Sequence, residues 1–350
     1  MKTRTTVIGP FQVGATFVGA AMGAGFATGQ ELLQFFGYFG PAGLWGVMLA
    51  ASLLGLVAYS VLDIARRRKA ANYREVILYA AGDVLGTAMD YLITFFLFGG
   101  LVSMVAGSGA LMGEQFGWDR FTGAAITAML AAATVLLGLQ GIVDSMTFLV
   151  PVMFLGILAL GVTTALATGY FLAPTLWKSP ASAPVPFWPL SAVIYASYNL
   201  ILTVAVLAPL GVNTASKEDA ARGAAMGGAG LGAAAVAGYM SIVSRLPEAA
   251  AYEVPMMFVA GMLGPAVKAG YALIIMLSIY TTAISVLYGF VSRLPVPAGP
   301  AKTALTLATA VAALMLASVG FTNVVRVLYP SVGVAGTVLL ASLALSALRH

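Results

Sequence analysis

Apolar runs of about 18 or more residues, separated by short polar segments, recur along the whole chain. Each run is long enough to cross the roughly 30 Å hydrocarbon core of a bilayer as an α-helix, whereas a β-barrel would show short alternating segments. The pattern predicts an all-α integral membrane protein with about ten spans. We expect these spans at residues 7–38, 42–65, 84–113, 121–140, 145–169, 187–211, 219–243, 265–291, 302–319 and 321–347.

Two segments between spans have patterns of their own. Residues 70–83 (AANYREVILYAAGD) are interpreted as a short amphipathic helix on the membrane surface. Residues 246–260 (LPEAAAYEVPMMFVA) are interpreted as a re-entrant or interfacial hairpin between the seventh and eighth spans.

Composition agrees with a membrane protein: 61% of the 350 residues are hydrophobic and 8% are charged, against about a quarter charged in soluble domains. Cysteine is absent and the single histidine is His350. Disulfides, thiolate sites and histidine-based catalytic triads are therefore excluded, and we expect neither an enzyme nor an organic cofactor. The first apolar run has no cleavage-like site after it, so we expect it to remain a membrane helix.

The net charge of +5 is explained by membrane topology rather than by a nucleic-acid partner. With the N-terminus in the cytoplasm, twelve basic residues fall inside: Lys2, Arg4, Arg66, Arg67, Arg68, Lys69, Arg74, Lys217, Arg222, Arg293, Lys302 and Arg349. Five fall outside: Arg120, Lys178, Arg245, Lys268 and Arg326. The bias predicts a multi-pass protein of the cytoplasmic (inner) membrane with both termini in the cytoplasm. The oligomeric state is left open.

The proline-rich loop 173–186 (APTLWKSPASAPVP) divides the ten spans into five and five. An odd number of helices in each half gives the second half the opposite topology. Inverted repeats of this kind build many secondary transporters, whose sites lie at the repeat interface near the bilayer midplane. We therefore predict one transporter domain over 1–350, with five-helix repeats at 7–170 and 187–348.

The first span contains the stretch GAAMGAGFATGQELLQFF, residues 19–36, with glycines and then Gln30 and Glu31 at mid-depth. A helix break in a membrane is tolerated only where protein or a wet cavity covers it. A break here would free carbonyls that can bind a cation and amides that can hold a carboxylate. The alternative is close helix packing, which we prefer for the uncharged RGAAMGGAGLGAAAVAG, residues 222–238. In the first span, the intramembrane carboxylate indicates function.

The sixth span, FWPLSAVIYASYNLILTVAVLAPLG at 187–211, would be the counterpart of the first span in a five-plus-five repeat. Its centre is polar and aromatic but lacks glycine. Tyrosines and asparagine suit the wall of a site for a small amphiphile, although these groups could equally bond to neighbouring helices. The candidate substrate-binding residues are Gly23, Ala24, Gly25, Phe26, Ala27, Thr28, Gly29, Gln30, Glu31, Tyr195, Ser197, Tyr198 and Asn199.

The motif GAGFATGQELLQFF resembles the signature of the YkvI-type membrane proteins, a branch of the amino acid–polyamine–organocation superfamily. The resemblance implies a LeuT-type fold in which helices one and six are broken at the site. It does not supply a substrate.

The eighth span presents a hydroxyl stripe, because Ser278, Thr281, Thr282 and Ser285 fall at i, i+3, i+4 and i+7 of a helix. The resemblance implies a sodium site between this stripe and the first-span break. We expect its ligands to be Gly23 and Phe26 (carbonyl oxygens) with Ser278, Thr281 and Thr282 (hydroxyls). The alternative is that these hydroxyls bond to carbonyls of their own helix.

The remaining acids suggest gates. Glu31 and Arg326 have comparable predicted depths on the outer side and could form an extracellular gate; otherwise Glu31 binds the amine of a substrate while Arg326 extends to the surface. Asp90 could join Arg4 or Lys2 in an inner gate. Asp63, Asp83 and Asp144 are expected to be solvated.

These features together predict a secondary active transporter of a small amino-acid-like or organic amine solute, coupled to Na⁺ as a symporter. Two alternatives stay open at this point. One is a proton-coupled carrier in which Glu31 titrates, and the other is a ligand-sensing membrane receptor subunit without net transport.

Overall fold

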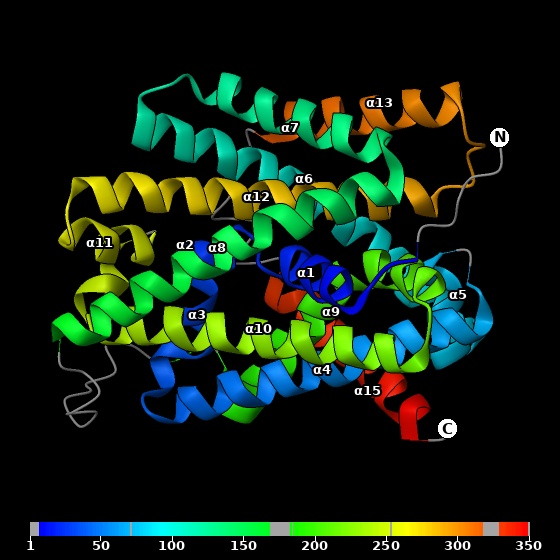
Figure 1. Cartoon of the computed structure of the whole chain (residues 1–350), viewed down its shortest axis with the longest axis horizontal. Coiled ribbons are helices and arrows are strands. Elements are labelled where there is room, and N and C mark those ends of the chain that lie inside the picture. The colour runs from blue at the N-terminus through cyan, green and yellow to red at the C-terminus, as the bar shows by residue number, and fades with distance from the viewer. Residues whose placement is uncertain are drawn as a thin grey trace.

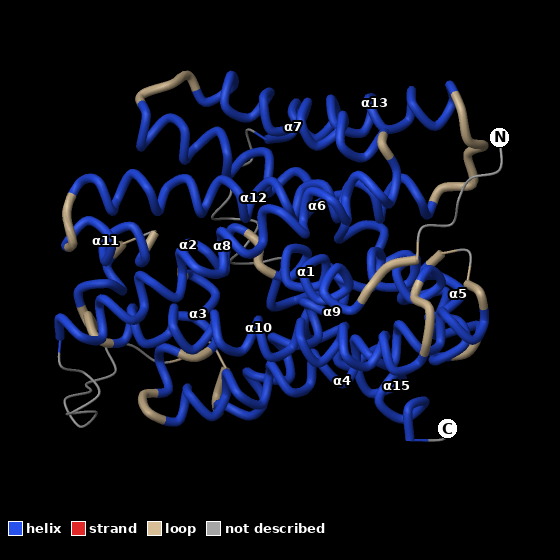
Figure 2. Tube along the Cα trace, viewed as in Figure 1, coloured by secondary structure: helices blue, strands red, loops and turns tan. Residues whose placement is uncertain are grey.

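The computed structural model describes residues 7–70, 72–168, 183, 185–252, 254–317 and 329–348. Figure 2 shows helices joined by loops through this part of the chain, and an isolated bridge between Ile8 and Thr214 is the β-type pairing found there. The elements of the first half are α1 Pro10–Ala21, α2 Ala24–Thr28, α3 Gln30–Phe35, η1 Gly37–Phe39, α4 Ala42–Arg68, α5 Tyr73–Ala81, α6 Asp83–Phe116, α7 Arg120–Leu136 and α8 Gly138–Thr168. Those of the second half are α9 Trp188–Asn213, α10 Lys217–Val243, η3 Glu248–Ala251, α11 Pro255–Met262, α12 Pro265–Arg293, α13 Pro300–Leu316 and α15 Tyr329–Leu348.

Local sequence sets many of these helix ends. Asn72, Asp119 and Ser216 cap α5, α7 and α10, because each side-chain oxygen accepts a hydrogen bond from an amide of the first turn. Proline occupies the first turn of α1, α9, α11, α12 and α13, where its missing N–H leaves no bond unmade. Gly138, with φ +75°, makes the tight turn between α7 and α8. The fourth span therefore ends at Leu136, a few residues before its predicted end.

The helices form a bundle in which α7 and α13 lie along one edge and α4 and α10 along the opposite edge (Figure 1). Helices α6 and α12 pack together inside the first edge, and α1 lies across the centre against α8, α9 and α10. The most enclosed long helix is α9, with 89% of its most apolar window buried. It packs against α1, α4, α12 and α15, so the centre of the bundle is built around α1 and α9.

In the described part of the chain, six helices are long and apolar enough to span a bilayer: α4, α6, α8, α9, α10 and α12. Shorter apolar helices lie at Arg120–Leu136, Pro300–Leu316 and Ser331–Ser346. With the interrupted first helix, they account for the ten predicted spans. The prediction of an all-α, multi-pass membrane protein is confirmed, while the residues separating the last two spans lie largely outside the described part.

The first span is broken at its glycines, as predicted. Helix α1 ends at Ala21, and Met22 leaves helical geometry at φ −79° and ψ 68°. The short α2 follows, and Gly29 then takes the left-handed conformation, φ 84°, before α3 begins. A residue with a side chain would be strained at this φ. Glycine at position 29 therefore suits the second interruption of the helix.

The sixth span is not broken, and the expectation of a second break is wrong. Helix α9 runs continuously from Trp188 to Asn213. Its centre lacks glycine, and its polar side chains bond to their own helix: Ser197 to the Val193 carbonyl and Asn199 to the Tyr195 carbonyl. The centre of α9 has no glycine that would permit an unwound turn. Its bonded side chains would not satisfy the backbone groups that unwinding exposes.

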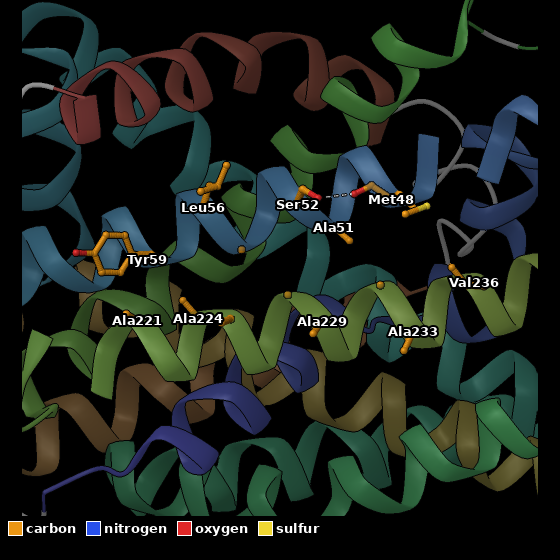
Figure 3. A pocket seen from close by; sticks show the side chains of 14 residues that line it. Met48, Ala51, Ser52, Leu56, Tyr59, Ala221, Ala224, Ala229, Ala233 and Val236 are labelled. Atoms are coloured by element: carbon orange, nitrogen blue, oxygen red, sulfur yellow. Dashed lines mark hydrogen bonds between the residues drawn. The ribbon is translucent and has the colours of Figure 1, made fainter. Parts of the chain in front are cut away.

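Helix α10 confirms the packing interpretation of its glycines. A Cβ atom on Gly223 would lie 2.6 Å from Val13 Cβ, and one on Gly228 would lie 2.9 Å from Gly55 Cα. Backbones therefore approach closely where the small residues align. The same small residues leave an apolar groove of about 520 Å³ between α4 and α10, lined by alanines and glycines with Met48 and Tyr59 toward its ends (Figure 3).

The two predicted inter-span segments are helical. In α5, Val76 and Ile77 are fully buried against α6, α9 and α15, so its apolar face is covered by protein. The segment 246–260 forms η3 and the start of α11. Helix α11 packs against α12 and the central α2, which closes the bundle beside the break.

Asp90 is the centre of an ion cluster at one end of the bundle. It has no exposed surface, Arg293 of α12 donates to both of its carboxylate oxygens, and Arg74 Nε of α5 makes an ionic contact at 3.3 Å. The predicted partners Lys2 and Arg4 lie outside the described residues. The cluster ties α5, α6 and α12 together.

Asp63 was expected to be solvated, and this is wrong. It is 7% exposed and pairs with two arginines one turn later on α4, at 3.0 Å and 2.9 Å. The Arg66–Arg68 run that ends α4 thus supplies the counter-charge locally. Asp83 and Asp144 are exposed, as predicted.

We predict that Asp90→Asn lowers the thermal midpoint of the purified protein, because it removes the charge that two arginines share in a buried position. Loss of such a partner costs about 3 kcal/mol. The matched control is Asp83→Asn, an exposed acid at the start of the same helix. Equal midpoints for the two variants would contradict the assigned role of the cluster.

Candidate binding site

Glu31 lies directly over the break in the first helix. It sits in the first turn of α3, is 3% exposed, and turns its side chain back toward α2. A Cβ atom on Gly25 would lie 2.7 Å from Glu31 Cδ, so the carboxylate occupies the space that a side chain at position 25 would need. Gly25 is therefore required for the close approach of this acid to the backbone of α2.

The carboxylate of Glu31 meets an aromatic wall on α9. The Tyr198 hydroxyl donates to Glu31 Oε2. The ring of Tyr195, one turn earlier on α9, lies 5.3 Å from the Tyr198 ring. Phe35, one turn after Glu31 on α3, lies 5.4 Å from the Tyr195 ring and 5.6 Å from the Tyr198 ring. Glu31 of the first span is thus brought together with Tyr195 and Tyr198 of the sixth.

Four buried side-chain oxygens in the described part of the chain have no hydrogen-bond partner: Ser103 Oγ, Asn199 Oδ1, Ser278 Oγ and Thr282 Oγ1. Such atoms are rare in native proteins because leaving a buried acceptor unpaired costs about 1–3 kcal/mol. They come from three helices, α6, α9 and α12.

The register of these helices places the unpaired oxygens close to one level. A Cβ atom on Gly100 of α6 would lie 3.6 Å from both Leu202 Cδ2 of α9 and Val286 Cγ1 of α12. Ser103, Asn199 and Thr282 lie about one helical turn away from Gly100, Leu202 and Val286, respectively. All three are displaced toward the same end of the bundle, because α6 runs antiparallel to α9 and α12. Ser278 lies one further turn along α12.

The break in the first helix lies at the same level, beside α12. A Cβ atom on Gly23 would lie 3.3 Å from Thr282 Oγ1, so backbone of the first helix faces the hydroxyl directly. Thr282 Oγ1 therefore meets the interrupted helix, and the other unpaired oxygens lie near the same level of the bundle. We call this level, with the break and the unpaired oxygens, the polar centre. Ser103 was missed by sequence reasoning, because a lone serine in an apolar helix gives no signal until the register is known.

The predicted cation ligands are only partly available. The carbonyl of Gly23 accepts from the Ala27 amide and that of Phe26 from the Gly29 amide, both at 3.0 Å. The Thr281 hydroxyl donates to the Ser278 carbonyl at 3.1 Å. By contrast, no backbone amide of the described residues donates to the Met22 carbonyl, which lies at the break itself.

The remaining candidates of the first span hold the short segments in place. Tyr271 of α12 donates its hydroxyl to the Ala27 carbonyl at 2.9 Å, and Thr28 donates to the Gly25 carbonyl at 3.2 Å. Gln30 donates to the Tyr252 carbonyl at 3.2 Å, which fastens α3 to the segment after η3. Ala24 is buried within α2.

The centre is closed in this structure. The cavity that Asn199 lines together with Phe26, Phe36 and Tyr195 measures about 10 Å³, room for about one water molecule. A solute can enter only if side chains or the short helical segments move. The gate between Glu31 and Arg326 stays a prediction, because Arg326 lies outside the described residues.

An interrupted first helix enclosed by α8, α9, α10 and α12, with unpaired oxygens at the interruption, is the architecture of a LeuT-type membrane protein. No family model matches the chain. It is 29% identical to the uncharacterized membrane protein YkvI of Bacillus subtilis (strain 168), over 92% of this chain and 91% of that protein.

Solved structures share the fold. MhsT in complex with L-phenylalanine matches 97% of this chain and 87% of its own, with a TM-score of 0.71 and 18% identity. A Na⁺-coupled sialic acid symporter, substrate-bound and outward-open, matches 98% and 90%, with a TM-score of 0.65 and 12% identity. The resemblance to YkvI-type proteins and the LeuT-type fold are confirmed; membership of the amino acid–polyamine–organocation superfamily stays a prediction.

We predict that Gly25→Ala displaces the Glu31 carboxylate from Tyr198 and lowers the thermal midpoint. The carboxylate ends a flexible side chain, so the variant folds, but it loses a buried charge-assisted hydrogen bond of about 2 kcal/mol. In a Glu31→Ala background the same change has no such effect, because the space is already free.

The control for this prediction is Gly270→Ala on α12, where an added Cβ meets no atom within 4 Å. It should leave the midpoint unchanged or slightly raised, since alanine favours helix over glycine. A Gly25→Ala defect of equal size in both backgrounds would show that the contact with Glu31 is not its cause.

Proposed function

We propose that the protein is a secondary active transporter that carries a small amino-acid-like or amine solute together with Na⁺. The fold it shares with a Na⁺-coupled symporter supports this class. The observation that carries the proposal is the unpaired Thr282 Oγ1, which faces the break at Gly23, with the unpaired Ser278 Oγ one turn away on the same helix.

A sodium ion accounts for these oxygens. It takes oxygen ligands without requiring a formal negative charge, and interrupted helices supply carbonyls for this purpose. We propose the Met22 carbonyl with the Thr282 and Ser278 hydroxyls as ligands. Gly23, Phe26 and Thr281 are weaker candidates, because their oxygens or hydroxyls already make bonds within their own helices.

The proposed transport cycle opens the centre to each side in turn. At the end of the bundle near Ile8, the Ile8 amide donates to the Asn213 carbonyl at 3.0 Å. At the same end, the Asp90 cluster ties α5, α6 and α12 together. On the other side, the Ser191 hydroxyl donates to the Phe35 carbonyl at 2.7 Å. Each set is small enough to break and re-form, and the two five-helix halves, 7–170 and 187–348, would move relative to each other.

A proton-coupled carrier is the second candidate, and the burial of Glu31 beside a tyrosine hydroxyl favours it over the receptor alternative. In that mechanism the carboxyl group gains and loses a proton while Na⁺ has no effect. Uptake into proteoliposomes separates a carrier from a sensing receptor subunit, and choline in place of Na⁺ separates the two couplings.

We predict that Thr282→Val weakens the apparent affinity for Na⁺ at least about tenfold, which is equivalent to about 1.4 kcal/mol of binding free energy. The affinity is read from the Na⁺-dependent stabilisation of the purified protein. Valine keeps the shape and removes the unpaired oxygen. Thr281→Val should have a smaller effect, because its hydroxyl already bonds to the Ser278 carbonyl. The measurement is the thermal midpoint in titrations of NaCl against choline chloride.

Ser285→Ala is the matched control, because Ser285 is buried on the same helix and donates to the Thr281 carbonyl. Its Na⁺ response should equal that of the unmodified protein. Unchanged Na⁺ dependence in Thr282→Val would exclude the proposed ligand set and place the ion elsewhere. No effect of Na⁺ on the unmodified protein would instead leave proton coupling as the better account.

A further inference from the structure

Glu31 has no basic partner among the described residues. The four ion pairs found there all involve Asp63 or Asp90. The contact that Glu31 makes with a side-chain donor is the neutral hydroxyl of Tyr198. A buried carboxylate is strongly stabilised by a counter-charge, so the charged group of a cationic solute would be favoured beside Glu31.

The rings around Glu31 suit a cation as well. Phe35, Tyr195 and Tyr198 lie with their centroids 5.3–5.6 Å apart in pairs, and Phe36 lies 4.9 Å from Tyr195. Aromatic faces attract ammonium groups, most strongly where water is excluded. Glu31 and Phe35 are one turn apart on α3, so acid and ring present the same face to α9.

The same geometry disfavours a second carboxylate. The space over Gly25, in the short helix that follows the break, is filled by the Glu31 carboxylate. A carboxylate on the solute would meet this like charge, and no basic side chain of the described residues pairs with Glu31 or lines the cavity beside it. The helical segment α2 has only five residues and offers no full helix terminus as compensation.

We infer that the solute is a small organic monocation without a carboxylate, whose ammonium group replaces the Tyr198 hydroxyl at Glu31 among the rings of Phe35, Tyr195 and Tyr198. The inference rests on the proposed function for the assumption that a solute reaches this centre. It narrows the solute from amino acids and amines to amines alone.

The test uses the purified full chain and two sets of matched compounds that share a hydrocarbon and differ in charge. One set is phenethylamine, L-phenylalanine and 3-phenylpropionate, chosen because MhsT is solved with L-phenylalanine. The other is isobutylamine, L-valine and 3-methylbutanoate. We expect at least one amine to raise the thermal midpoint while its amino acid and acid do not.

Variants locate the effect. Glu31→Gln should weaken amine binding at least about tenfold, whereas Glu114→Gln, an exposed acid near the end of α6, should leave it unchanged. Tyr198→Phe keeps the ring and removes the competing hydroxyl, so it should bind the amine as tightly as the unmodified protein or more tightly. This second variant provides a test even if Glu31→Gln fails to fold.

Four results would overturn the inference: an amino acid that stabilises as well as its amine, no stabilisation by either amine, unchanged amine affinity in Glu31→Gln, or transport restored by combining Glu31→Arg with Arg326→Glu. The last would assign Glu31 to the gate. Amine binding without uptake would count against the transporter proposal alone, and Na⁺-driven uptake of an amino acid in preference to its amine would count against this inference alone.

Discussion

The structure depends on one constraint: a helix interrupted inside a membrane must have its backbone covered by protein. The break at Met22 and Gly23 frees groups that hydrocarbon cannot satisfy. Helices α8, α9, α10 and α12 enclose it, and the Tyr271 hydroxyl reaches the Ala27 carbonyl across the bundle. Small residues also let α1 and α10 approach closely, with Gly223 against Val13 and Gly227 against Phe17, which holds in place the helix that leads into the break.

Two buried carboxylates in this bundle are stabilised in opposite ways. Asp90 is surrounded by Arg293 and Arg74, so its charge is compensated within the protein and it joins three helices. Glu31 receives a tyrosine hydroxyl and, among the described residues, no positive charge. A compensated charge holds structure together, whereas an incompletely compensated one at a helix break is available for a ligand. The contrast is the reason for placing the proposed solute at Glu31 rather than at Asp90.

The centre is also asymmetric. The first helix contributes backbone, because glycine permits interruption at Gly23 and Gly29. The sixth span contributes side chains from a continuous helix, with Tyr195 one turn before Tyr198 and Asn199. Ion and solute would therefore meet backbone oxygens from one side only. The other ligands of the proposed sodium site must be side-chain hydroxyls. Ser278 and Thr282 of α12 have unpaired hydroxyl oxygens that can serve.

The sequence by itself determined the membrane class, the helix positions and the break, because hydrocarbon thickness fixes the length of apolar runs and glycine fixes where a helix can be interrupted. It also identified Glu31 and the hydroxyl stripe, since polar groups inside apolar spans are conspicuous. Only the tertiary structure decided which of them meet. Ser103 joins the centre through helix register, Asp90 pairs with Arg293 two hundred residues away, and Glu31 folds back over Gly25 onto Tyr198. These pairings depend on how helices pack in three dimensions, and periodicity along one chain does not specify its neighbours.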